Sequence, residues 1–258
     1  MTYVKVILLY MIFYLMHELA HILCSYIFGY TIESIKFKWT GFNINFKEEI
    51  INPIYDVAIS LSGPASNLIC ILFFYYVFSN EILFRVNFVL FLFNIMPFNY
   101  SDGGRTLRMI LKYYVGFYKS YIIVNLCSII FAVFLLIVSF LNINKLNFIL
   151  IFFVGIAIII NSIIDYNNIV INILKDVYAK NIFFKNRRII KIKLKGVQSS
   201  NKILDIIKTF CFNKYYVIYV FENTKIIGKV TEYEIINYFL SFGNVTFEEL
   251  IKKSGRSF

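Results

Sequence analysis

Charged residues are scarce in this 258-residue chain, at 16%, whereas 59% of the residues are hydrophobic and the mean hydropathy is +0.71. Soluble domains contain roughly 45–50% apolar residues, so this composition excludes an ordinary soluble protein. The cysteines stand singly and without metal or redox spacing, which indicates reduced packing residues: Cys24, Cys70, Cys127 and Cys211. No small-residue cleavage site follows the first apolar segment, so we expect that segment to be retained.

Long apolar segments are abundant and predict an α-helical polytopic membrane protein. About five transmembrane helices are expected, over residues 3–29, 57–78, 82–96, 118–141 and 148–164. The third segment is the weakest, because it is short, contains Arg85 and Asn87, and ends at Pro97.

Charge divides the chain near residue 165. Residues 1–164 contain ten Lys and Arg against seven Asp and Glu, whereas residues 165–258 contain 16 against eight. The tail therefore has a net charge of +8, and the positive-inside tendency predicts that it is a cytoplasmic domain. Counting back through five spans places loops 30–56 and 97–118 on the same side and Met1 on the other.

Histidine occurs only twice, at His17 and His21, within the sequence HELAH of the first apolar segment. Residues four apart lie on one face of a helix, so both imidazoles can bind one metal ion. Glu18 lies beside them and can accept a proton without being a ligand. An ionisable residue at mid-bilayer costs about 2.5–3.5 kcal/mol, so three together indicate a catalytic zinc site rather than core residues.

A catalytic zinc ion usually has three protein ligands, so a third ligand is needed from elsewhere in the chain. Asp102 follows the third apolar segment, although the sequence SDGG around it is also typical of a turn. Asp56 is the competing candidate, although a carboxylate at the start of a helix needs no metal to explain it.

Three motifs in order resemble the site-2 protease family of intramembrane zinc metalloproteases: HELAH, then SGPASN at 62–67, then N-x-x-P and DGG at 94–104. The resemblance covers residues 1–165 and implies that Asp102 is the third ligand. It also implies that the SGPASN element lines the core. Asn94 is then a candidate to hydrogen-bond the substrate backbone or a developing oxyanion.

Residues 33–46 alternate apolar and polar positions around Thr40 and Gly41, which predicts a β-hairpin. The family has such a sheet beside its active site, where an edge strand can pair with an extended substrate. An interfacial loop anchored by Trp39 is the alternative.

The tail, residues 185–258, is expected to be a small α/β domain joined by a linker over 166–184. The predicted elements are a strand at 187–194, a helix opening at Ser200, a hairpin around 222–224, and a helix with Thr231 as N-cap and Glu234 in a capping box. This order is similar to a single cystathionine-β-synthase-type (CBS) regulatory domain. That resemblance implies that Thr231 and Glu234 contact an adenine nucleotide such as ATP, although capping alone also explains them.

The order of domains, membrane spans followed by a single C-terminal CBS-type domain, is similar to that of the sporulation branch of the site-2 protease family. Members of this branch, the stage IV sporulation proteases, process a sigma-factor precursor. Those proteins have an additional span before the HExxH helix, for which His17 lies too near Met1 here. The resemblance implies a membrane-associated protein substrate, membrane inhibitor proteins and lipid as partners, and no nucleic acid. Because one CBS domain forms half of a nucleotide cleft, a homo-oligomer is also expected.

The leading hypothesis is therefore a zinc metalloendopeptidase with His17, His21 and Asp102 as ligands and Glu18 and Asn94 as catalytic residues. An inactive membrane scaffold of the same fold is the runner-up. A metal transporter is disfavoured, because the polar residues are concentrated in one helix and one loop.

Overall fold

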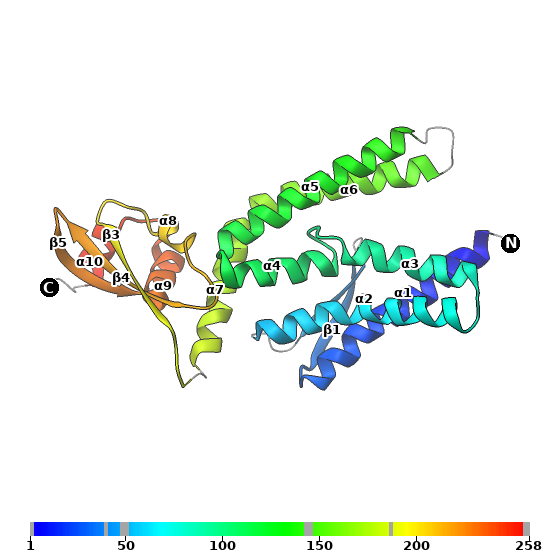
Figure 1. Cartoon of the computed structure of the whole chain (residues 1–258). Coiled ribbons are helices and arrows are strands. Elements are labelled where there is room, and N and C mark those ends of the chain that lie inside the picture. Colours follow the sequence, from blue (N-terminus) through cyan, green and yellow to red (C-terminus); the bar gives the residue numbers. More distant parts are fainter. Residues whose placement is uncertain (1–2, 39–40, 47–51, 142–146, 186–187, 255–258) are drawn as a thin grey trace. The chain divides into compact units, whose positions relative to one another are not determined.

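The computed structural model describes residues 3–38, 41–46, 52–141, 147–185 and 188–254 (Figure 1). The chain forms two compact units, each with its own contacts. The first contains residues 1–110 and 123–165, and the second contains residues 111–122 and 166–258.

Four of the described helices are long and apolar enough to span a membrane: α1 (Tyr3–Ile27), α2 (Pro53–Tyr76), α5 (Phe117–Leu141) and α6 (Asn147–Asn167). At about 1.5 Å per residue each exceeds the roughly 30 Å hydrocarbon core. Their large apolar side chains are mostly exposed in the structure, as a lipid-facing surface requires. These helices confirm an integral membrane protein, with four candidate spans in the described residues instead of the five expected.

The expected third span is the shorter helix α3 (Glu81–Ile95), which packs against α1 and α2. Its 15 residues extend only about 22 Å, too short to cross the hydrocarbon core without thinning the bilayer. The helix ends because Met96 adopts an extended conformation, with φ −63° and ψ 141°, directly before Pro97. Proline disfavours helical conformation in the residue that precedes it.

Loop 97–118 was the expected connection, but most of it is helix α4 (Asp102–Tyr114). The amide of Gly104 donates to the Ser101 hydroxyl over 2.9 Å, which caps the first turn. Two adjacent glycines are typical of a turn, which is why the sequence favoured a loop here. Gly103 and Gly104 instead lie in the first turn of α4, so the loop interpretation was wrong. The Ser101 cap instead starts a helix at the position where the sequence predicted the third ligand.

The hairpin expected around residue 41 is present as β1 (Ile32–Lys38) and β2 (Gly41–Phe46), paired antiparallel. Trp39 and Thr40 lie outside the described residues. The hairpin follows directly after α1, the helix that carries both histidines.

The second unit contains a three-stranded sheet with the order β3-β4-β5, in which β3 is parallel to β4 and β4 antiparallel to β5. Its elements are α7 (Ile169–Lys185), β3 (Ile192–Gln198), α8 (Ile203–Ile207), β4 (Tyr215–Glu222), β5 (Lys225–Thr231), α9 (Glu232–Phe242) and α10 (Phe247–Ser254). Buried apolar residues from α7, α8, α9 and all three strands form its core.

Two local predictions in the tail are confirmed. Asn223 and Thr224 have φ values of 46° and 82°, which is the backbone twist of a two-residue hairpin turn. Thr231 caps α9, and its side chain and that of Glu234 form a capping box.

Two other predictions in the tail are wrong. The first strand begins at Ile192 rather than at residue 187. The helix expected from Ser200 shrinks to five residues, because residues 199–201 form a turn in which the Asn201 amide donates to the Gln198 carbonyl.

The segment expected as a linker, 166–184, contains most of α7, and a fully buried ion pair joins this helix to α9. The Lys180 ammonium lies 2.7 and 2.8 Å from the two carboxylate oxygens of Glu232. Burial lowers the pKa of Lys180 and raises that of Glu232, and the pairing opposes both shifts. Aromatic rings lie 5.1 to 5.8 Å from the ammonium: Phe117, Phe184, Phe210 and Tyr216.

Candidate metal centre

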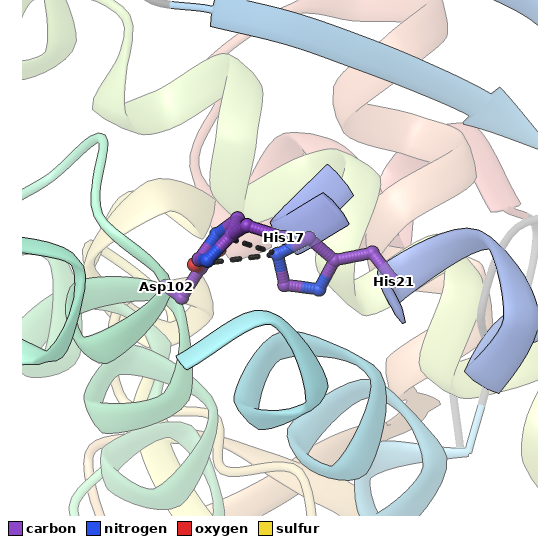
Figure 2. A group of neighbouring side chains, drawn as sticks. All are labelled: His17, His21 and Asp102. Atoms are coloured by element: carbon purple, nitrogen blue, oxygen red, sulfur yellow. Dashed lines mark hydrogen bonds and ion pairs between the residues drawn. The ribbon is translucent and has the colours of Figure 1, made fainter. Parts of the chain in front are cut away.

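The two histidines of α1 and the first residue of α4 bring three ligand atoms together (Figure 2). The Nε2 atoms of His17 and His21 lie 3.2 Å apart, and Oδ2 of Asp102 lies 3.0 Å from the first and 3.3 Å from the second. Ligands about 2.0–2.1 Å from a tetrahedral zinc ion are separated by about 3.3 Å. The three atoms therefore have the mutual spacing of ligands to one zinc ion.

The other nitrogen of each imidazole has a partner on α2. Nδ1 of His21 donates to the Ile59 carbonyl over 2.7 Å, and Nδ1 of His17 lies 2.9 Å from the side-chain amide of Asn67. A neutral imidazole that binds metal through Nε2 carries its proton on Nδ1. The Ile59 carbonyl therefore holds His21 in the metal-binding tautomer. Nδ2 of Asn67 faces Nδ1 of His17, and the metal-binding tautomer of His17 requires this amide to be turned so that its oxygen accepts from Nδ1.

Gly63 of α2 lies directly against the two ligand nitrogens. A Cβ atom at this position would lie 2.3 Å from Nε2 of His21 and 2.6 Å from Nε2 of His17. The sequence predicts only that Gly63 permits close helix packing. In the structure the absence of a side chain at Gly63 makes room for the two ligand nitrogens.

Replacing Gly63 with alanine is expected to weaken zinc binding by about 10- to 100-fold, because the added methyl group displaces the imidazoles. Zinc affinity measured by chelator competition on the purified chain tests this. Gly155→Ala is the matched control, because its methyl group would meet the flexible end of Leu136 at 3.0 Å, away from the histidines. Equal affinities for the two variants would contradict the prediction.

The start of α4 fixes the position of Asp102. Added Cβ atoms on Gly103 and Gly104 would lie 2.1 and 1.8 Å from the carbonyl oxygens of Ile95 and Phe98. The two glycines therefore let the first turn of α4 pack against the end of α3 and the connection after it. Burial raises the pKa of Asp102, but its interactions with His17 and His21 outweigh this and lower it to about 2. The carboxylate is therefore ionised at neutral pH, as a metal ligand must be.

Glu18 lies next to the cluster but supplies none of its three ligand atoms. It is half-buried, accepts a hydrogen bond from Tyr14, and interacts electrostatically with all three ligands. This position suits a proton acceptor beside the metal.

The remaining predicted residues are not joined to the cluster by any hydrogen bond among the described residues. Asn94 donates to the Leu90 carbonyl over 3.1 Å, one turn earlier on α3, which leaves its side-chain oxygen able to accept. Asp56 forms an ion pair with Arg105. The Glu234 carboxylate accepts from both the amide and the hydroxyl of Thr231, each over 2.9 Å, so capping accounts for the two residues.

Two features of the site were not found from the sequence. The sequence patterns predict neither Asn67 as the partner of His17 nor Arg105 as the partner of Asp56. The role of Asn67 does have a signal in the sequence. The buried residues of α2 follow one helical stripe through Ile59, Gly63 and Asn67, so Asn67 faces the same way as the other two.

The fold and the cluster define a polytopic membrane protein with a His-His-Asp site of metal-ligand geometry. Among solved structures, the chain is similar to the Site-2 Protease from Methanocaldococcus jannaschii, with a TM-score of 0.51 and 23% sequence identity. The similarity covers 64% of this chain and 79% of that one. No protein-family model and no curated protein matches the chain. The structural similarity shows that the chain has a site-2 protease fold.

Proposed function

We propose that this protein is an intramembrane zinc metalloprotease that hydrolyses a peptide bond at or near the membrane. The convergence of His17, His21 and Asp102 at zinc-ligand distances carries the proposal. The donor set of two neutral imidazoles and one carboxylate is typical of catalytic zinc, and it leaves a fourth position for water or substrate. The site-2 protease fold supports the same function.

Bound at these three residues, zinc would act as a Lewis acid on the scissile carbonyl and lower the pKa of water. Glu18 accepts the proton of the attacking water and passes it to the leaving amine. Asn94 is proposed to hydrogen-bond the substrate through the oxygen that its own helix does not use. The edge of the β1–β2 hairpin is proposed to pair with an extended substrate segment.

The sporulation-branch resemblance supports a finer proposal, in which the substrate is a membrane-associated sigma-factor precursor and membrane proteins inhibit the enzyme. In this proposal the basic tail lies in the cytoplasm, where such a precursor would be. An adenine nucleotide at the tail and assembly as a homo-oligomer rest on the CBS resemblance alone. Thr231 and Glu234 are already paired with each other, so a nucleotide would have to displace these hydrogen bonds.

An inactive scaffold of the same fold is the second candidate. It predicts loss of a ligand or of the proton acceptor, and the structure retains all of them.

Metal removal and return test the proposal. Full-length protein purified in detergent should contain about one zinc ion per chain and cleave a sigma-factor precursor supplied as substrate. A chelator should abolish cleavage, and stoichiometric zinc should restore it. Cleavage is followed by the appearance of the shorter product on gels and by mass spectrometry.

The same preparation separates the two candidates. A chain that binds zinc but cleaves neither the precursor nor generic membrane substrates would be a scaffold. A chain that binds no zinc would contradict the metal centre itself.

A further inference from the structure

One stripe of α2 contacts the two histidines at three positions, each about one helical turn from the next. The Ile59 carbonyl accepts from His21, Gly63 lies against both ligand nitrogens, and Asn67 contacts His17. Asp56, one turn before Ile59, belongs to the same buried stripe. Three members of the stripe therefore act on the histidines, which leaves the role of Asp56 to be explained.

Asp56 forms an ion pair with Arg105 of α4, which lies three residues after the ligand Asp102. The Asp56 side chain is 10% exposed and that of Arg105 is 48% exposed. Residues three apart on a helix lie on neighbouring positions of one face. The face of α4 that presents Asp102 to the histidines is therefore the face that Arg105 ties to α2.

The position of the third ligand depends on a contact between helices, whereas the separation of the other two ligands does not. His17 and His21 lie on one helix, so the helix itself sets their separation. Asp102 comes from a different helix, and its distance from the histidines depends on how α4 is held. A displacement of about 1 Å is enough to impair a metal or catalytic site.

We propose that the Asp56–Arg105 ion pair is a positioning device that holds Asp102 within ligand distance of His17 and His21. The inference rests on the proposed zinc centre. With it, one stripe of α2 orients all three ligands: His21 through Ile59, His17 through Asn67, and Asp102 through Asp56 and Arg105. Losing either partner also leaves a charge without its counter-ion, and in the case of Asp56 that charge is buried.

The test uses full-length protein with Asp56→Asn, Arg105→Gln, the double variant, and Arg105→Lys. The double variant Glu81→Gln/Arg85→Gln is the matched control, because this ion pair of α3 is exposed and away from the cluster. Zinc affinity is measured by chelator competition. The visible spectrum of the Co²⁺-loaded protein reports the geometry of the ligands.

Each single neutral variant is expected to bind zinc about tenfold more weakly and to alter the Co²⁺ spectrum. The Asp56→Asn/Arg105→Gln double variant should bind zinc no more weakly than either single variant, because the two residues act as one unit. Arg105→Lys should restore part of the affinity, and the α3 control should match the parent. If Asp56→Asn does not fold, the Arg105→Gln and Arg105→Lys variants test the proposal, because the Arg105 side chain is half-exposed and its replacement disturbs folding less.

Parent-like zinc affinity and spectrum in folded Arg105→Gln would overturn the inference and leave the ion pair as a helix contact only. Such a result would not affect the proposed function, since the parent would still bind zinc. Absence of zinc binding by the parent, in contrast, would remove the proposed function.

Discussion

Glu18→Gln is expected to abolish peptide-bond cleavage while the purified chain keeps its zinc. Glu18 supplies none of the three ligand atoms, so glutamine leaves the metal coordination intact. Glutamine cannot accept the proton of the attacking water, and loss of general-base catalysis alone costs about 10²- to 10⁴-fold in rate. The measurement pairs the zinc content of each preparation with the turnover of one substrate.

The matched control is Glu81→Gln, the same chemical change at a residue of α3 whose side chain is 72% exposed. Turnover and zinc content should both equal those of the parent. Near-parent turnover of Glu18→Gln at full zinc occupancy would show that another group accepts the proton. Loss of zinc together with activity would instead identify Glu18 as part of the coordination.

Asp102→Ala is expected to remove both zinc and activity, because it deletes one of three ligands. The two remaining imidazoles would hold the ion far more weakly, by on the order of 100-fold or more, since removing a ligand exceeds the 10- to 100-fold effect of its outer partners. Metal analysis of the purified variant, combined with zinc titration, checks this.

Asp165→Ala is the control for Asp102→Ala. Its carboxylate lies in the same unit and accepts a hydrogen bond from the Tyr100 hydroxyl over 3.1 Å. Its removal should leave about one zinc per chain. Full zinc occupancy in Asp102→Ala would exclude this residue as a ligand and would reopen the choice of the third one.

The features of the fold and site that the sequence predicts correctly are mostly local ones, set by residues close together in the chain. Residues four apart share a helix face, which placed His17 and His21 together before any tertiary contact was known. The capping box at Thr231 and Glu234 and the two-residue turn at 223–224 are equally local, and both appear in the structure. Failures occurred where composition was ambiguous. The glycines after Asp102 read as a loop, although they begin α4.

The sequence by itself determined the membrane character, the pair of histidines and the neighbouring Glu18, because these follow from hydropathy and from the spacing of residues within one helix. The tertiary structure decided which carboxylate joins them: Asp102 reaches the imidazoles, whereas Asp56 pairs with Arg105. It also showed that Gly63 makes room for the ligand nitrogens. These contacts join residues 38 to 85 positions apart, and their geometry depends on how separate helices pack, which spacing along the chain does not specify.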